Sequence, residues 1–185
     1  VVVFHDVSEL RGLTRKMSYQ ATHDPLTGLV NRREFERRLD EAMDSAHAEE
    51  AVHMLFYMDL DRFKAVNDSC GHMAGDNMLR EVAALIKDQV RDSDFVGRLG
   101  GDEFGALLIG CPIEKARQIA TDICNAIADY RFVWKDKIFN IGISIGLVEI
   151  SHASGTLQDV MSAADSACYM AKQQGRGQVH IYSAR

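Results

Sequence analysis

The chain has 185 residues, of which 46% are hydrophobic and 26% charged, a composition typical of a globular domain with a single core. Its net charge of −6 argues against a surface that binds DNA or RNA through the phosphate backbone. No apolar run approaches the roughly 18 residues that a membrane span needs, and nothing at the N-terminus resembles a signal peptide. We therefore expect a cytoplasmic fragment without direct membrane contact, although its parent protein could be anchored in a membrane.

The cysteines do not form a metal or redox motif. Cys70, Cys111, Cys124 and Cys168 lie far apart, and no two of them have the Cys-x-x-Cys spacing. We interpret them as reduced thiols of the core.

The first twenty residues divide into two predicted elements. Residues 1–4 are β-branched and aromatic, which predicts a strand, and a helix follows with apolar residues at Leu10, Leu13 and Met17. In one interpretation residues 1–19 end a preceding domain and connect it to a domain of residues 20–185. In the other, the helix simply packs on the core.

The rest of the chain alternates helices and strands. Asp24-Pro25 starts a turn, and Asn31 with Glu34 has the spacing of a capping box that opens a helix. Hydrophobic periodicity predicts helices at 31–47, 75–90, 113–129 and 157–173, and strands at 51–58, 95–99, 104–109, 138–149 and 179–182.

This order of elements is typical of a split βαβ arrangement, an α+β sandwich in which a mainly antiparallel sheet of about five strands carries the helices. We expect the helices on one face of the sheet, and the first strand beside the second strand of the hairpin at 95–109. The end of the first strand then lies next to the hairpin tip. Four acidic side chains are predicted to converge there: Asp59, Asp61, Asp102 and Glu103.

Four clustered carboxylates repel one another and raise their own pKa values, so the cluster predicts a bound cation. Magnesium fits, because it takes one or two carboxylates together with substrate phosphates, and two such ions can hold the attacking and leaving oxygens of a phosphoryl transfer. A calcium loop of the EF-hand type is excluded, since Phe63 and Lys64 stand where that loop needs an acidic or amide residue and a glycine.

Basic residues near these acids are candidates for phosphate contacts. Lys64 and the backbone amides of residues 62–64 follow the first strand, and Lys172 and Arg176 end the last long helix. Each residue alone is more often a solvated surface charge, so its value lies in combination with the acids. The glycine pair before Asp102 gives a ligand room to approach the backbone, or is only a turn.

Two polar residues flank the segment 68–75. The Asn67 amide and the Asp76 carboxylate can together read the edge of a guanine, the carboxylate accepting from its N1 and N2 hydrogens. Alternatively, Asp76 caps the helix that starts beside it.

Six ordered motifs run through the chain. They are Asp24-Pro25-Leu26-Thr27-Gly28-Leu29, Asn31-Arg32-Arg33, Asp59-Leu60-Asp61-Arg62-Phe63-Lys64 with Asn67-Asp68, Gly71-His72 with Gly75-Asp76, Arg98-Leu99-Gly100-Gly101-Asp102-Glu103-Phe104, and Ala171-Lys172 with Gly175-Arg176. With these motifs, residues 20–183 resemble a GGDEF domain of the diguanylate cyclase family.

The resemblance implies a ferredoxin-like, palm-type nucleotide cyclase fold that condenses two GTP molecules into cyclic di-GMP and releases two pyrophosphates. It also implies two magnesium or manganese ions per active site, held by Asp59, the Leu60 carbonyl and Asp102. Either Asp102 or Glu103 would take the proton from the ribose 3′ hydroxyl that attacks the other GTP.

The same resemblance implies a substrate site and an assembly. Guanine would be recognised by Asn67 and Asp76, and the rest of the substrate would be contacted by Phe63, Lys64, Gly101, Lys172 and Arg176. Because two half-sites must face each other, the active species would be a homodimer.

Arg91 and Asp94 match the Arg-x-x-Asp inhibitory site of that family. Spacing alone is more typical of a polar turn that ends a helix. With the resemblance, the pair predicts inhibition by the product, cyclic di-GMP.

Residues 1–19 are similar to the end of a PAS sensor domain running into its signalling helix, and many relatives continue past the position of Arg185 into an EAL phosphodiesterase domain.

Two other functions remain open. The domain could bind GTP or cyclic di-GMP without turnover and regulate a neighbouring domain, but degenerate members usually lose the acidic hairpin tip or the first-strand Asp, and this chain keeps both. A purely structural dimerisation module would leave the clustered acids without a reason.

Overall fold

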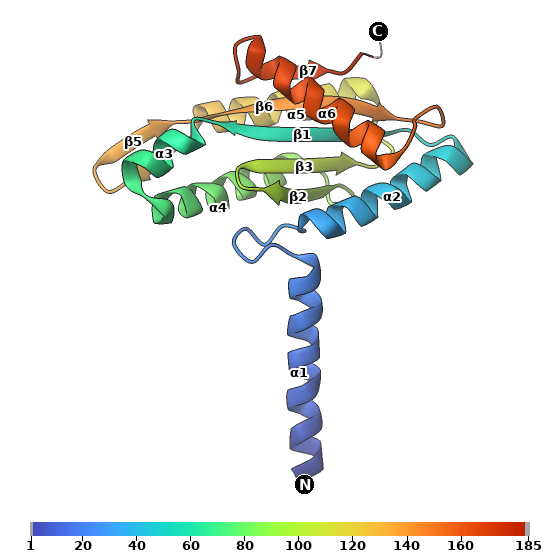
Figure 1. Ribbon diagram of the computed structural model, residues 1–185, viewed down its shortest axis with the longest axis vertical. Helices are drawn as coiled ribbons and strands as arrows, with labels where there is room; N and C mark the ends of the chain where they lie inside the picture. The colour runs from blue at the N-terminus through green and yellow to red at the C-terminus, as the bar shows by residue number, and fades with distance from the viewer. Residues whose placement is uncertain (1, 184–185) are drawn as a thin grey trace.

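A computed structural model describes residues 2–183, with side chains from Leu10 onward, and Figure 1 shows a body of sheet and helices from which one long helix projects. In chain order the elements are α1 (Val2–Thr22), α2 (Arg32–Glu49), β1 (His53–Asp61), α3 (Phe63–Cys70), α4 (His72–Gln89), β2 (Phe95–Gly100), β3 (Glu103–Leu108), α5 (Ile113–Asp129), β4 (Arg131–Trp134), β5 (Lys137–Asn140), β6 (Gly142–Ile150), α6 (Leu157–Gln173) and β7 (Val179–Ile181). Across this described part of the chain, no helix is both long and apolar enough to cross a membrane.

A five-stranded sheet forms the centre of the body, with the strand order β2-β3-β1-β6-β7. The pairs formed by β2, β3, β1 and β6 are antiparallel, whereas β7 runs parallel to β6. A separate two-stranded ribbon is made by β4 and β5. The predicted α+β fold with a mainly antiparallel sheet is confirmed, and so is the place of the first strand beside the second hairpin strand.

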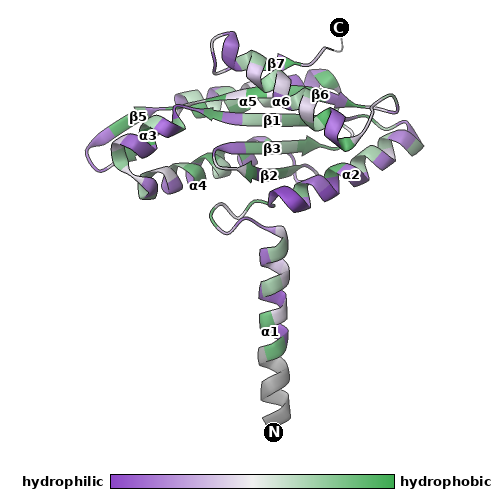
Figure 2. Ribbon diagram, viewed as in Figure 1, coloured by the Kyte–Doolittle hydropathy of each residue, from purple (hydrophilic) through white to green (hydrophobic). Residues whose placement is uncertain are grey.

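Helices cover both faces of this sheet. α4 and α5 pack on the face that carries Met54, Phe56 and Met58, whereas α2 and α6 pack on the face that carries Leu55 and Tyr57. In Figure 2 the central strands β1 and β3 are hydrophobic along most of their length. The prediction of helices on one face is therefore wrong. A strand buried on both faces has a continuous apolar sequence, which is what β1 has.

α1 does not pack on the core. Its apolar side chains Leu10, Leu13 and Met17 are exposed, and the helix stands away from the body in Figure 1. Residues 2–4 belong to this helix and not to a strand, because a strand needs a neighbour with which to pair; Val1 lies outside the described residues. The interpretation of a helix packed on the core is wrong, and that of a connecting helix remains.

Other predicted boundaries differ as well. The helix predicted at 75–90 begins earlier, at His72, and another helix, α3, precedes it; the two are joined at Gly71, whose φ is +87°. α3 has a single buried residue, Val66, so hydrophobic periodicity gives no signal for it. The predicted strand at 138–149 is two strands, since β5 pairs with β4 while β6 joins the main sheet.

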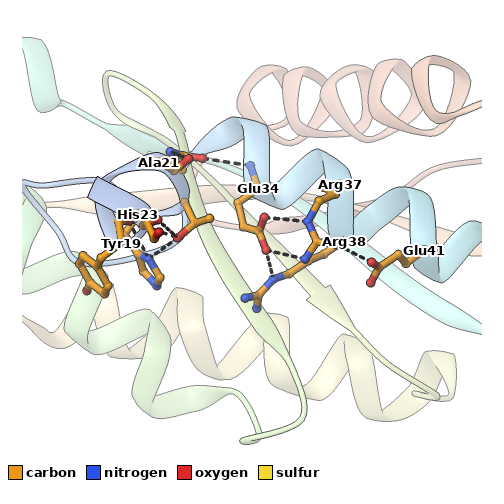
Figure 3. Close-up of polar contacts among 10 residues, drawn as sticks. Tyr19, Ala21, His23, Glu34, Arg37, Arg38 and Glu41 are labelled. Carbon is orange, nitrogen blue, oxygen red and sulfur yellow. Dashed lines mark hydrogen bonds and ion pairs between the residues drawn. The ribbon is translucent and has the colours of Figure 1, made fainter. Parts of the chain in front are cut away.

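α2 begins at its predicted cap, but the capping box is only half formed. The Asn31 side chain accepts a hydrogen bond from the Glu34 N–H at 3.0 Å, and its amide nitrogen donates to the Ala21 carbonyl, which ties α2 to the end of α1. The Glu34 carboxylate turns to Arg37 and Arg38 instead of back to the cap (Figure 3). Hydrogen bonds from these two guanidinium groups lower the pKa of Glu34 to about 2.

α6 approaches the sheet closely over one glycine. A Cβ on Gly146 would lie 2.2 Å from the Ala164 carbonyl oxygen and 2.3 Å from the Cys168 nitrogen, so a side chain there would push the helix away. At the start of the helix, Thr156 and Asp159 form a complete capping box. α6 is thereby held directly on β6.

We expect Gly146→Ala to lower the free energy of unfolding by about 1–3 kcal/mol, because the added methyl group overpacks the contact between β6 and α6. Chemical denaturation measures this change. Gly12→Ala is the control, since no atom lies within 4 Å of the added Cβ and alanine favours a helix. A Gly146→Ala protein as stable as the unmodified one would show that the helix does not depend on this close approach.

Candidate active site

The predicted acidic site forms where β1 meets the tip of the β2–β3 hairpin. Asp59 lies directly opposite Glu103 in the pairing of β1 with β3, and the Leu60 N–H donates a hydrogen bond to the Asp102 carbonyl oxygen at 3.1 Å. The hairpin turns at Gly101, whose φ is +27°. The sheet therefore brings the end of the first strand to the hairpin tip, as the sequence predicts.

Asp59 carries a charge that its surroundings compensate only in part. Its Oδ1 is buried and has no hydrogen-bond partner among the described residues, and its Oδ2 lies 3.4 Å from the Lys172 Nζ. Burial, followed by the nearby carboxylate of Asp102, raises the pKa of Asp59 to about 7. Two adjacent, partly buried carboxylates cost free energy unless a cation neutralises them. Asp59 and Asp102 therefore fit a divalent cation, to which the Leu60 carbonyl could add a third oxygen ligand.

The four predicted acids do not form one cluster. Asp61 lies two residues beyond Asp59 on β1 and is hydrogen-bonded to β6 and to the segment after α6. Glu103 accepts a hydrogen bond from the Tyr57 hydroxyl at 2.6 Å. Within residues 2–183, no three His, Cys, Asp or Glu side chains form a group that can hold a metal ion. The predicted convergence of four acids is thus reduced to the pair Asp59 and Asp102.

Lys172 and Arg176 reach the acids from the end of α6. The Lys172 Nζ lies 3.4 Å from the Asp59 Oδ2 and 3.3 Å from the Asp61 Oδ1, and the Arg176 Nη1 lies 3.6 Å from the same Asp61 oxygen. The Arg176 side chain is 58% exposed, which leaves it free to contact a ligand. Both basic residues therefore lie beside the acids of β1, which is the combination that makes them candidates for phosphate contacts.

Phe63 and Lys64 are the first residues of α3, which begins directly after β1. Arg62 makes the turn with a φ of +71°, and Lys64 is exposed. The first N–H groups of a helix have no acceptor within the helix, so they are available to an anion. These amides lie next to the acids in the chain, and their contact with phosphate stays a prediction.

Asn67 and Asp76 lie on the two helices that follow β1. The Asn67 Oδ1 is buried without a partner in the described structure, and a Cβ on Gly75 would lie 1.9 Å from it, so Gly75 makes room for the amide. Asp76 is exposed beside that glycine and does not cap α4, which begins at His72 with Gly71 as its N-cap. The capping alternative is wrong, and guanine recognition remains the hypothesis for this pair.

The two residues of the predicted inhibitory site, Arg91 and Asp94, form an ion pair with each other. The Arg91 guanidinium donates to both oxygens of Asp94 at 2.9 and 2.8 Å, and the Ile109 N–H donates to Asp94 as well. The Asp94 side chain is completely buried and holds the Arg91 guanidinium in place, and the role of this pair in product inhibition stays a prediction. Arg91 itself is partly exposed and borders a pocket of about 360 Å³, which Arg38 and Lys87 also line.

A further arginine holds the hairpin tip in place. Arg98 donates to the Gly101 carbonyl from two nitrogens, at 3.1 and 3.0 Å, and to Asp24 at 3.2 Å. Asp24 also accepts hydrogen bonds from the N–H and the hydroxyl of Thr27. Sequence reasoning noted these motif residues without a role, although an Asp followed three residues later by Thr in a turn is a signal for such bonds. It also missed Tyr57, for which the sequence has no signal beyond a position on a buried strand.

The site consists of two neighbouring carboxylates, Asp59 and Asp102, beside the basic side chain of Lys172. A family model described as "Diguanylate cyclase, GGDEF domain" matches residues 21–178. The chain belongs to this GGDEF family.

Similar proteins include cyclases and a phosphodiesterase. The chain is 48% identical over 182 residues to the probable diguanylate cyclase DgcE of Escherichia coli and 34% identical over 182 residues to the cyclic di-GMP phosphodiesterase PdeB of Shewanella oneidensis; each match covers 98% of this chain. The matches span only 16% and 21% of those two relatives.

Among solved structures, the coiled coil and GGDEF domain of DgcB from Caulobacter crescentus, in complex with cyclic di-GMP, has a TM-score of 0.90 and 28% identity to this chain. The match covers 97% of this chain and 95% of the DgcB chain. The likeness therefore includes α1 as well as the body.

Removing the charge of Asp59 should stabilise the metal-free protein at high pH. The pKa of Asp59 is raised from 3.8 to about 7 by folding, so its ionisation lowers stability as the pH rises through this interval. Asp59→Asn should raise the free energy of unfolding by about 2 kcal/mol at pH 8 and leave it unchanged near pH 4. Urea denaturation at both pH values tests this, with Asp165→Asn on the exposed face of α6 as the control. Destabilisation by Asp59→Asn at pH 8 would contradict the account.

Proposed function

We propose that this domain is a diguanylate cyclase, which joins two GTP molecules into cyclic di-GMP and releases two pyrophosphates. The observation that carries the proposal is the buried, unpartnered carboxylate oxygen of Asp59 beside Asp102, with Lys172 next to both acids of β1. A partly buried carboxylate would only cost free energy in a site for a neutral ligand, whereas in phosphoryl transfer assisted by a cation it binds that cation.

Two magnesium or manganese ions per active site suit the donor set. Asp59, Asp102 and the Leu60 carbonyl would hold them, and they would neutralise the acids and the charge on the substrate phosphates. Hard oxygen ligands favour these ions over softer metals. The buried Asp59 Oδ1, which lacks a partner among the described residues, supports this assignment.

The chain's own residues position GTP and move one proton. Lys172, Arg176 and the start of α3 with Phe63 and Lys64 would bind the phosphates near Gly101, and Asn67 with Asp76 would bind guanine. The ribose 3′ oxygen of one GTP then attacks the α-phosphorus of the other, the bond to pyrophosphate breaks, and Asp102 or Glu103 accepts the hydroxyl proton. Tyr57 supports a role for Glu103, because its hydroxyl orients that carboxylate.

Each chain supplies one half of the reaction centre. One domain offers a single acid pair and one set of phosphate-binding groups, whereas the product requires two GTP molecules that attack each other. We therefore propose a homodimer in which the two sites face each other, so that the monomer is inactive. Residues 1–19 are proposed to comprise the end of a preceding PAS-like domain and its signalling helix, which sets this arrangement, and residues 20–185 are proposed to be the catalytic domain.

A second candidate function has one observation in its favour. A relative named as a cyclic di-GMP phosphodiesterase is similar over almost the whole chain, so a GGDEF domain can also occur in a protein that carries that name. In such a setting the domain would bind GTP or cyclic di-GMP and regulate a neighbouring domain without turnover. The intact acid pair favours the cyclase.

The cyclase proposal is tested with purified protein, GTP and magnesium, with products resolved by chromatography. We expect cyclic di-GMP from the unmodified chain at high protein concentration, and a loss of at least about a hundredfold in Asp102→Ala. Asp129→Ala, which removes an exposed acid at the end of α5, should keep full activity. GTP binding without any cyclic dinucleotide would instead identify the regulatory module.

Arg91 is proposed to bind cyclic di-GMP as a feedback inhibitor. It is the partly exposed member of its pair and borders the pocket of about 360 Å³. Arg91→Ala should weaken cyclic di-GMP binding at least about tenfold, because it removes charge-assisted hydrogen bonds, while turnover stays within about threefold. Calorimetric titration measures the binding, with the exposed Arg117→Ala as a control. Unchanged affinity would show that the product binds elsewhere.

A further inference from the structure

Asp61 joins three parts of the fold. It is 4% exposed at the end of β1, and the Ser144 hydroxyl on β6 donates to its two oxygens at 3.0 and 3.2 Å. The Gly177 N–H, from the segment between α6 and β7, donates to its Oδ2 at 3.0 Å. A Cβ on Gly142 would lie 3.1 Å from the same oxygen, so the missing side chain there gives the carboxylate room.

The segment after α6 has a backbone that side chains rarely adopt. Gly175, Arg176 and Gly177 have φ values of +126°, +64° and +60°. For Arg176, which has a Cβ, the left-handed region costs free energy and persists where surrounding contacts hold it. The Arg176 N–H bonds to the Ala171 carbonyl, and the next N–H bonds to Asp61. Asp61 thus helps to hold the backbone that presents Arg176.

Asp61 also determines where Lys172 lies. The ammonium group is 3.3 Å from Asp61 and 3.4 Å from Asp59, so the two acids share it. Without the charge of Asp61, the ammonium would pair with Asp59 alone and compete with a cation at that carboxylate. The arrangement keeps Lys172 beside Arg176 and leaves Asp59 partly free.

We propose that Asp61 is a positioning residue, which fixes Lys172 and the Arg176 segment as one phosphate-binding unit without itself touching the substrate. The proposal rests on the function given above, in which these two basic residues contact the GTP phosphates. Neutralising Asp61 then weakens the binding of GTP through two residues at once, and affects the chemical step less.

The test is the binding of 3′-deoxy-GTP, which lacks the attacking hydroxyl and so cannot react, in the presence of magnesium. Asp61→Asn should weaken this binding about tenfold and raise the KM for GTP by a similar factor, with kcat changed less than about threefold. In a double-mutant cycle, Lys172→Ala should have a smaller effect in the Asp61→Asn protein than alone, because Asp61 acts through Lys172. In the ligand-free protein, the Gly177 amide should exchange its hydrogen faster in Asp61→Asn.

Asp159→Asn is the matched control, since it removes a carboxylate from the capping box at the other end of α6. It should lower stability without weakening the binding of 3′-deoxy-GTP, which separates positioning from general destabilisation. Unchanged binding in Asp61→Asn, or effects of Asp61→Asn and Lys172→Ala that multiply independently, would overturn the positioning role while leaving the cyclase in place. An unmodified protein that binds no 3′-deoxy-GTP would overturn both.

Discussion

The hydrogen bond from the Leu60 N–H to the Asp102 carbonyl fixes how the end of β1 meets the hairpin tip. The antiparallel register of β1 with β3 puts Asp59 opposite Glu103 and beside Asp102, and a slip of one residue would turn every side chain of the strand to the other face. The acid pair therefore depends on backbone geometry that the core enforces. Arg98 secures the other side of the tip by binding the Gly101 carbonyl.

Helix α6, which packs on the sheet, brings a positive charge to the acids of β1. α6 lies directly on β6 because Gly146 has no side chain, and its last turn carries Lys172 to the acids of β1. The charges are unequally satisfied: Asp61 is surrounded by donors, whereas one oxygen of Asp59 has none among the described residues. This difference agrees with the proposed roles of the two acids, in which Asp61 positions the phosphate-binding residues and Asp59 binds a cation.

Sequence alone was sufficient for much of the fold, because the apolar runs of β1 and β6 and the periodicity of α5 and α6 are strong signals. It could not show that helices lie on both faces, which depends on the burial of β1 on both sides, nor α3, which buries only Val66. For the site, topology correctly brought Asp59 to Asp102. The hydrogen-bond partners of Asp61 and Glu103 come from distant segments, so no local pattern in the sequence indicates them.

The most direct test of this account is the binding of Mn²⁺ to the protein in the presence of 3′-deoxy-GTP, measured by electron paramagnetic resonance. The account predicts tight binding to the unmodified chain and a loss of at least about tenfold in Asp59→Asn, because a carboxylate ligand is removed. Equal affinity in the two proteins would contradict the assignment of the acid pair as the cation site.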